Sequence, residues 1–77
     1  MLILSQDKNL IINFDNTENL WINGPIENND GKFEIRAETH SANIMIGEYD
    51  TEERTQQVLR QIFSSASALD RYVMPEK

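Results

Sequence analysis

Hydrophobic and polar residues alternate without a break through residues 32–38. Phe33, Ile35 and Ala37 fall on one side of such a segment, and charged residues fill the other. The pattern predicts a strand with one solvent-exposed face. The segment Asn-Asp-Gly at 29–31 precedes it and is typical of a tight hairpin turn, because Asp and Gly accept left-handed backbone conformations.

A returning strand is predicted at residues 43–49, after a turn at 39–41. Ile44 and Ile46 would face inward with the apolar side of the preceding strand. Gly47 interrupts this strand, and a glycine inside a strand often indicates a bulge or a close approach of another segment.

The first part of the chain predicts another hairpin, formed by residues 2–4 and 10–14 around a polar turn at 6–9. A short apolar run at 20–22 predicts a third strand, and Asn-Gly-Pro at 23–25 predicts a turn after it. A short final strand is expected at 71–74, because Pro75 follows it.

One amphipathic helix is predicted over residues 50–68. Asp50 with Glu53 forms a capping box, and Thr51 is the alternative N-cap. Acidic residues at this end also match the positive end of the helix dipole. The apolar stripe has helical spacing; it comprises Thr55, Val58, Leu59, Ile62, Phe63, Ala66 and Leu69.

The order of strands, helix and strand predicts a single α+β domain over residues 1–77. We expect an antiparallel sheet of four to five strands, made of two hairpins and a short C-terminal strand, packed on one helix.

Four segments spread over the chain carry a resemblance to known proteins. They read SQDK (5–8), INFDN (12–16), GEYDTEER (47–54) and YVMPE (72–76). In these segments the chain resembles a family of small uncharacterised proteins of low-GC Gram-positive bacteria and their phages. The resemblance implies a shared fold and cytoplasmic expression, and it implies no activity. The four segments also have a structural explanation as turns, caps and packing residues.

Net charge limits the classes of partner that the protein is expected to bind. The chain carries a formal net charge of −6, and a negative field disfavours direct binding to nucleic acid or to an anionic membrane. It contains no cysteine, and no apolar run approaches the length of a membrane span. Together these features predict a cytoplasmic protein.

Residues with the chemistry for catalysis are sparse. His40 is the single histidine and is expected in a solvent-exposed turn, where it lacks an orienting partner. Glu52 and Glu53 point about 100° apart on a helix, so they cannot act as a pair. We therefore predict a non-enzymatic protein with no catalytic residue, no cofactor and no metal site.

The N-terminal hairpin is apolar on both sides, whereas one helix covers one face of a sheet. The set expected to face the helix is Leu2, Leu4, Leu10, Ile12, Phe14, Phe33, Ile35, Ile44 and Ile46. The opposite face would carry Ile3, Ile11 and Met45, with Trp21 nearby, and these four residues are the predicted interface.

Three coverings of that face are compatible with the sequence: a second copy of the chain in a homodimer, the loop at residues 20–26, or an unidentified protein partner. The sequence therefore predicts a protein-interaction module that self-associates through the sheet face away from the helix. The alternative is an acidic, phage-related decoy that inhibits a nucleic-acid-binding protein. The decoy requires acids gathered on one surface, and those considered are Glu18, Glu27, Glu34, Glu38 and Glu48.

Overall fold

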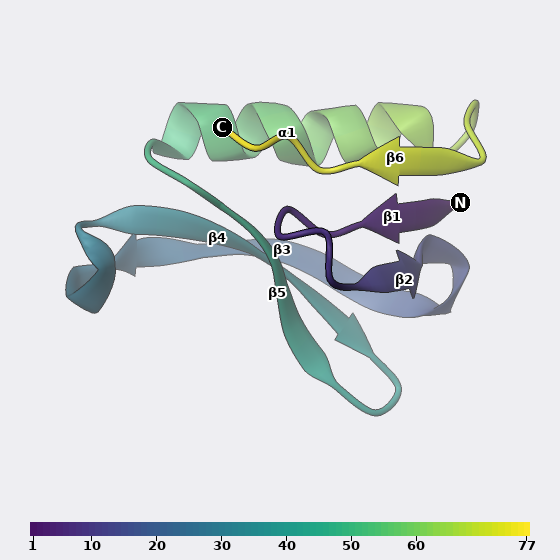
Figure 1. Cartoon of the computed structure of the whole chain (residues 1–77), viewed down its shortest axis with the longest axis horizontal. Helices are drawn as coiled ribbons and strands as arrows, with labels where there is room; N and C mark the ends of the chain where they lie inside the picture. The colour runs from purple at the N-terminus through teal and green to yellow at the C-terminus, as the bar shows by residue number, and fades with distance from the viewer.

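The computed structural model describes residues 1–77 and has the predicted α+β class, with one helix packed on strands that pair mainly antiparallel. The strands form two three-stranded sheets rather than one sheet (Figure 1). The elements are β1 (Leu2–Leu4), β2 (Ile11–Asn13), a 3-10 turn (Phe14–Asn16), β3 (Thr17–Ile26), a second 3-10 turn (Glu27–Asn29), β4 (Lys32–Thr39), β5 (Asn43–Tyr49), α1 (Glu52–Ser65) and β6 (Arg71–Val73).

The small sheet has the order β2-β1-β6. Its β1–β2 hairpin is antiparallel, as predicted, and pairs Ile3 with Ile12. The C-terminal strand β6 is also present as predicted, but it runs parallel to β1 and pairs Tyr72 with Ile3. The parallel pairing arises because α1 carries the chain along the molecule before β6 begins (Figure 1), and a parallel pair needs such a crossover.

The large sheet has the order β3-β4-β5, with both pairs antiparallel. The predicted turn at residues 23–25 is wrong, because β3 continues through them to Ile26. The register between β3 and β4 shifts between Asn23 and Ile26. Pro25 therefore lies at an irregularity of the strand and does not end it. Gly24 allows this because it has no side chain: a Cβ at this position would clash with the Phe33 ring, at 2.8 Å from its Cδ2.

The β3–β4 turn is built as the sequence predicts. Asp30 and Gly31 have φ angles of 54° and 72°, in the left-handed region, which asparagine, aspartate and glycine accept most readily. At the other end of β4, a turn leads into β5 one residue later than predicted: residues 40–42 connect the strands, because Thr39 still belongs to β4.

Gly47 has the role predicted for it. The β4–β5 register shifts between Ile35 and Arg36, so that Ile46 bulges beside Gly47. A Cβ on Gly47 would lie 2.7 Å from Cε of Met74. The missing side chain therefore lets the C-terminal segment approach β5 closely.

Helix α1 begins at the alternative cap and ends earlier than predicted. The Thr51 hydroxyl accepts a hydrogen bond from the Arg54 backbone N–H at 3.1 Å, so Thr51 and not Asp50 is the N-cap. The helix ends at Ser65, where the small residues 64–68 begin, because serine is a weak helix former. The Ser65 carbonyl then accepts backbone hydrogen bonds from Ala68 and Leu69.

A single core joins both sheets and the helix. Its nine buried side chains are Ile3, Ile12, Ile35, Ala37, Ile46, Tyr49, Val58, Ile62 and Met74. The predicted stripe of α1 is only partly buried: Thr55, Val58 and Ile62 face the core, whereas Phe63 and Leu69 are exposed. The stripe is wider than the sector of the helix that the sheets cover.

Candidate protein-interaction surfaces

The side chain of Gln6 joins three of the four segments that carry the family resemblance. Its Nε2 donates to the carbonyls of Glu48 at 2.8 Å, Glu76 at 3.0 Å and Pro75 at 3.3 Å. Its Oε1 accepts the backbone N–H of Glu48 at 2.8 Å. Residues 5–8, β5 and the C-terminal tail are thus tied together by one amide, which gives these segments a structural role.

Tyr49 reinforces the same junction. Its hydroxyl donates to the carbonyl of Pro75 at 2.9 Å, and its ring is buried beside Gly47. Burial raises the pKa of Tyr49 to about 12 because the charged phenolate is poorly solvated there. Tyr49 is therefore a packing residue, as the sequence predicts.

The acids of the large sheet are interleaved with bases. The guanidinium of Arg36 lies 3.3 Å from a carboxylate oxygen of Glu34. Lys32 lies 3.7 Å from Glu48 and 3.8 Å from Asp50. Two of the five acids that a decoy would gather are thus paired with positive charge, and this arrangement does not favour the decoy.

The four predicted interface residues do not form one surface. Ile3 is 0% exposed and lies in the core, so its assignment to an exposed face is wrong. The predicted faces of β1 are reversed: Ile3 lies inward and Leu2 outward, where Leu2 is 49% exposed. The faces of β2 are as predicted, because Ile12 is buried and Ile11 is exposed. A strand that is apolar on both sides does not itself specify which side is buried.

Ile11 is exposed as predicted, on the outer face of the small sheet. It pairs with Leu4, which also pairs with Val73, so these three side chains form one cross-strand row beside Leu2. Ile11 is 63% exposed, and a groove of about 450 Å³ follows this face. The loop expected to cover it does not, because residues 20–26 belong to β3 in the other sheet.

Trp21 and Met45 lie on the outer face of the large sheet. Both pair with Arg36, which stands between them on β4. The neighbouring rows on this face contain asparagine and glutamate, with hydrogen bonds such as that from Asn23 to Glu34 at 3.1 Å. This face is therefore mainly polar.

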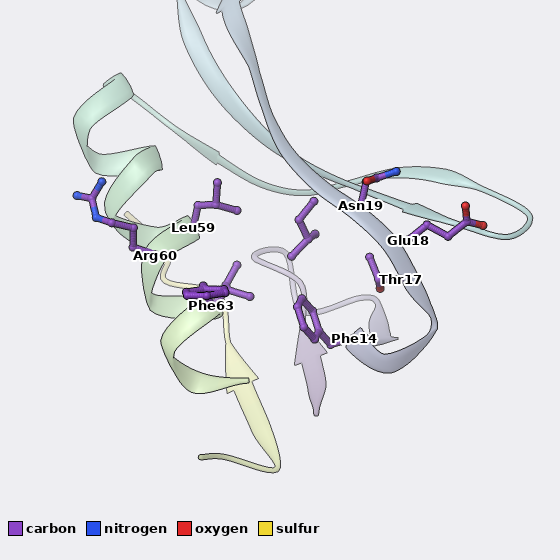
Figure 2. A pocket seen from close by; sticks show the side chains of 9 residues that line it. Phe14, Thr17, Glu18, Asn19, Leu59, Arg60 and Phe63 are labelled. Carbon is purple, nitrogen blue, oxygen red and sulfur yellow. The ribbon is translucent and has the colours of Figure 1, made fainter. Parts of the chain in front are cut away.

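A third surface, which the sequence did not indicate, is a cleft of about 440 Å³ between α1 and β3 (Figure 2). Its lining residues are Phe14, Thr17, Glu18, Asn19, Leu20, Leu59, Arg60, Ile62 and Phe63. Figure 2 shows Phe63 and Leu59 on the α1 wall and Phe14 on the opposite side. Phe63 is 80% exposed, the highest value among the large hydrophobic residues.

The margins of the cleft are charged. Arg60 lies on the α1 side and Glu18 on the β3 side, and both point outward (Figure 2). Glu18 has no pairing partner on β4, because the β3–β4 register shifts between Thr17 and Asn19. Neither Arg60 nor Glu18 belongs to any of the five ion pairs of the structure. The cleft thus has an apolar floor between two unpaired, opposite charges.

One signal in the sequence could have identified this cleft. Ile62 and Phe63 are adjacent, so their side chains diverge by about 100° around the helix. Both cannot point at the centre of the same core, and Ile62 is the buried one. An apolar stripe that spans adjacent positions therefore implies that one member lies at its edge.

The residues considered for chemistry lie apart. His40 is exposed in the β4–β5 turn. No three His, Cys, Asp or Glu side chains come together in a group that could hold a metal ion. The single helix is neither long nor apolar enough to cross a membrane. Comparison with protein-family models, with curated proteins and with solved structures finds no match to this chain.

Proposed function

We propose that the chain is a non-enzymatic protein-interaction module whose binding site is the cleft between α1 and β3. The observation that carries this proposal is the exposure of Phe63 at the wall of an apolar cleft. Aromatic side chains are enriched at the centres of protein interfaces. Burying a phenylalanine side chain stabilises a complex by about 1.5–3 kcal/mol, and Phe63 has most of that burial still to gain.

The placement of charged groups around the cleft favours a protein partner over a small molecule. Small-molecule sites enclose their ligand and aim a few polar groups at it. Here the charged groups of Arg60 and Glu18 point outward at the margins, while the floor is apolar. An apolar core with a charged rim is the usual composition of a protein interface.

Site-specific photo-crosslinking tests this function. Phe63 is replaced by p-benzoylphenylalanine, which preserves an exposed aromatic ring, and the full chain is irradiated in native lysate and also as purified protein. A matched control carries the same photo-reactive residue at His40, an exposed position in the β4–β5 turn. A further variant combines the Phe63 probe with Leu20→Lys, which places a charge inside the cleft.

We expect the probe at Phe63 to form a covalent adduct with a protein chain, and the probe at His40 to form none. Leu20→Lys should abolish the adduct while circular dichroism shows a folded chain, since Leu20 is only partly buried. If the probe at Phe63 labels no protein in either sample, or labels the same proteins as the probe at His40, the cleft is not a protein-binding site.

A further inference from the structure

We infer that the occupant of the cleft is a second copy of this chain, docked about a two-fold axis that passes through the cleft. The inference rests on the proposed function and names its partner. A symmetric dimer uses one surface twice, so that surface must be complementary to itself. The cleft meets this requirement in shape and in charge.

To be complementary to itself in shape, the surface must carry both a projection and a recess into which the projection of the other copy fits. Phe63 stands exposed on the α1 wall, and the recess lies between α1 and β3. A two-fold rotation through the cleft sets α1 of each copy against β3 of the other. Each Phe63 ring then packs against the Phe14 side of the partner's cleft.

The charge requirement is met by the two margins. Arg60 is on the α1 margin and Glu18 is on the β3 margin, and both lack an ion-pair partner within the chain. The rotation that places Phe63 in the recess also brings Arg60 of one copy to Glu18 of the other. Because the interface is symmetric, this pair forms twice. Each copy carries a net charge of −6, so association that lacks such pairs is opposed by repulsion.

The outer face of the small sheet is the competing surface for a second copy. Its charged neighbours, Asp70 and Arg71, are adjacent in sequence at the same end of the face. The cleft carries the most exposed large hydrophobic side chain, Phe63, and has opposite charges on its two sides, so we assign the second copy to the cleft.

Charge reversal at the two margins tests the dimer. Arg60→Glu and Glu18→Arg change exposed residues, so folding should be unaffected. Each variant alone faces like charges across the interface, whereas the two variants mixed in equal amounts restore two opposite pairs. Arg71→Glu is the matched control, because it reverses an exposed charge next to the outer face of the small sheet. Sedimentation velocity measures the dimer of each sample against the 8.9 kDa monomer.

The wild-type chain and the Arg71→Glu control should form dimers with dissociation constants within about threefold of each other, since the added charge of the control lies away from the cleft. Each single reversal at the cleft should raise the dissociation constant by about tenfold or more, since two attractive pairs become repulsive. The equimolar mixture and the double reversal should return to within about threefold of wild type.

A wild-type chain that remains monomeric at millimolar concentration overturns the inference, and so do single reversals that dimerise like wild type. A dimer that Arg71→Glu disrupts and Arg60→Glu does not would assign self-association to the small sheet instead. The two failures are distinguishable: if the photo-reactive residue at Phe63 labels only a foreign protein, the interaction module stands and the self-partner is wrong, whereas labelling of no protein overturns the proposed function as well.

Discussion

Gln6 makes more long-range side-chain hydrogen bonds than any other residue, and its replacement by alanine tests whether the junction of the three segments holds the fold together. Three of its contacts, with the carbonyls of Glu48 and Glu76 and with the N–H of Glu48, lie between 2.8 and 3.0 Å. A fourth, to Pro75, is longer at 3.3 Å. All four join residue 6 to segments more than 40 positions away in the sequence.

The expected loss of unfolding free energy in Gln6→Ala follows from these hydrogen bonds. A net contribution of about 1 kcal/mol for each of the three shorter bonds gives about 3 kcal/mol. Gln6 is only partly buried, so water takes over some of the freed groups, and about 2 kcal/mol is the expected decrease in unfolding free energy. The unfolding free energy of a 77-residue chain is roughly 4–12 kcal/mol, so this decrease is a large fraction of the total stability.

Urea denaturation followed by Trp21 fluorescence and by circular dichroism measures the effect. The matched control is Gln56→Ala on the exposed side of α1, which should leave stability unchanged or slightly raised because alanine favours helix. Gln6→Glu is the sharper variant: it retains the acceptor for the Glu48 N–H but places a carboxylate against carbonyl oxygens. It should be less stable than Gln6→Ala at pH 7. If Gln6→Ala loses under about 0.5 kcal/mol, or if Gln6→Glu equals wild type, the amide does not hold the junction.

Three further predictions concern the helix start and the packing of the C-terminal segment. Thr51→Ala removes the cap on the Arg54 N–H and should lower the unfolding free energy by about 1 kcal/mol, whereas Thr51→Ser should stay near wild type; equal urea midpoints for both would contradict this. Gly47→Ala places a methyl 2.7 Å from Met74 and should lower the unfolding free energy by about 1–3 kcal/mol, an effect that the combined Gly47→Ala, Met74→Ala variant should reduce if the clash is its cause. Tyr49 has a folded-state pKa of about 12 against 10.0 in the unfolded chain, so the unfolded chain releases its proton first and stability falls as pH rises from 10 to 12. Urea titrations across that range should show a smaller fall for Tyr49→Phe, and an unchanged fall would refute the assignment.

The elements that the sequence predicts well are those whose signals are local. Residues 32–38 have charge on one side only, so their alternation specifies both a strand and its buried face, and Ile35 and Ala37 are indeed buried. The Asp30-Gly31 turn follows from backbone conformations that few other residues accept. The helix follows from its period and from the cap at Thr51.

Strand β3 shows where local signals mislead. Gly24 and Pro25 usually indicate a turn, yet here they lie within a strand. Pairing with β4 on both sides of the irregularity holds the chain extended, and the absence of a side chain on Gly24 makes room for Phe33. Neither the pairing nor the contact can be deduced from residues 23–25 alone.

The sequence by itself determined the class of fold, the two hairpins and the helix, because each depends on the conformational preferences of neighbouring residues. Tertiary structure decided which apolar side chains remain in water. Leu2 and Ile3 are equally apolar, and only the position of the small sheet between core and solvent buries Ile3 and exposes Leu2. Phe63 likewise belongs to the helix stripe, but β3 lies too far across the cleft to cover it. Hydrophobicity is a property of the residue, whereas burial depends on how distant segments fill the space around it.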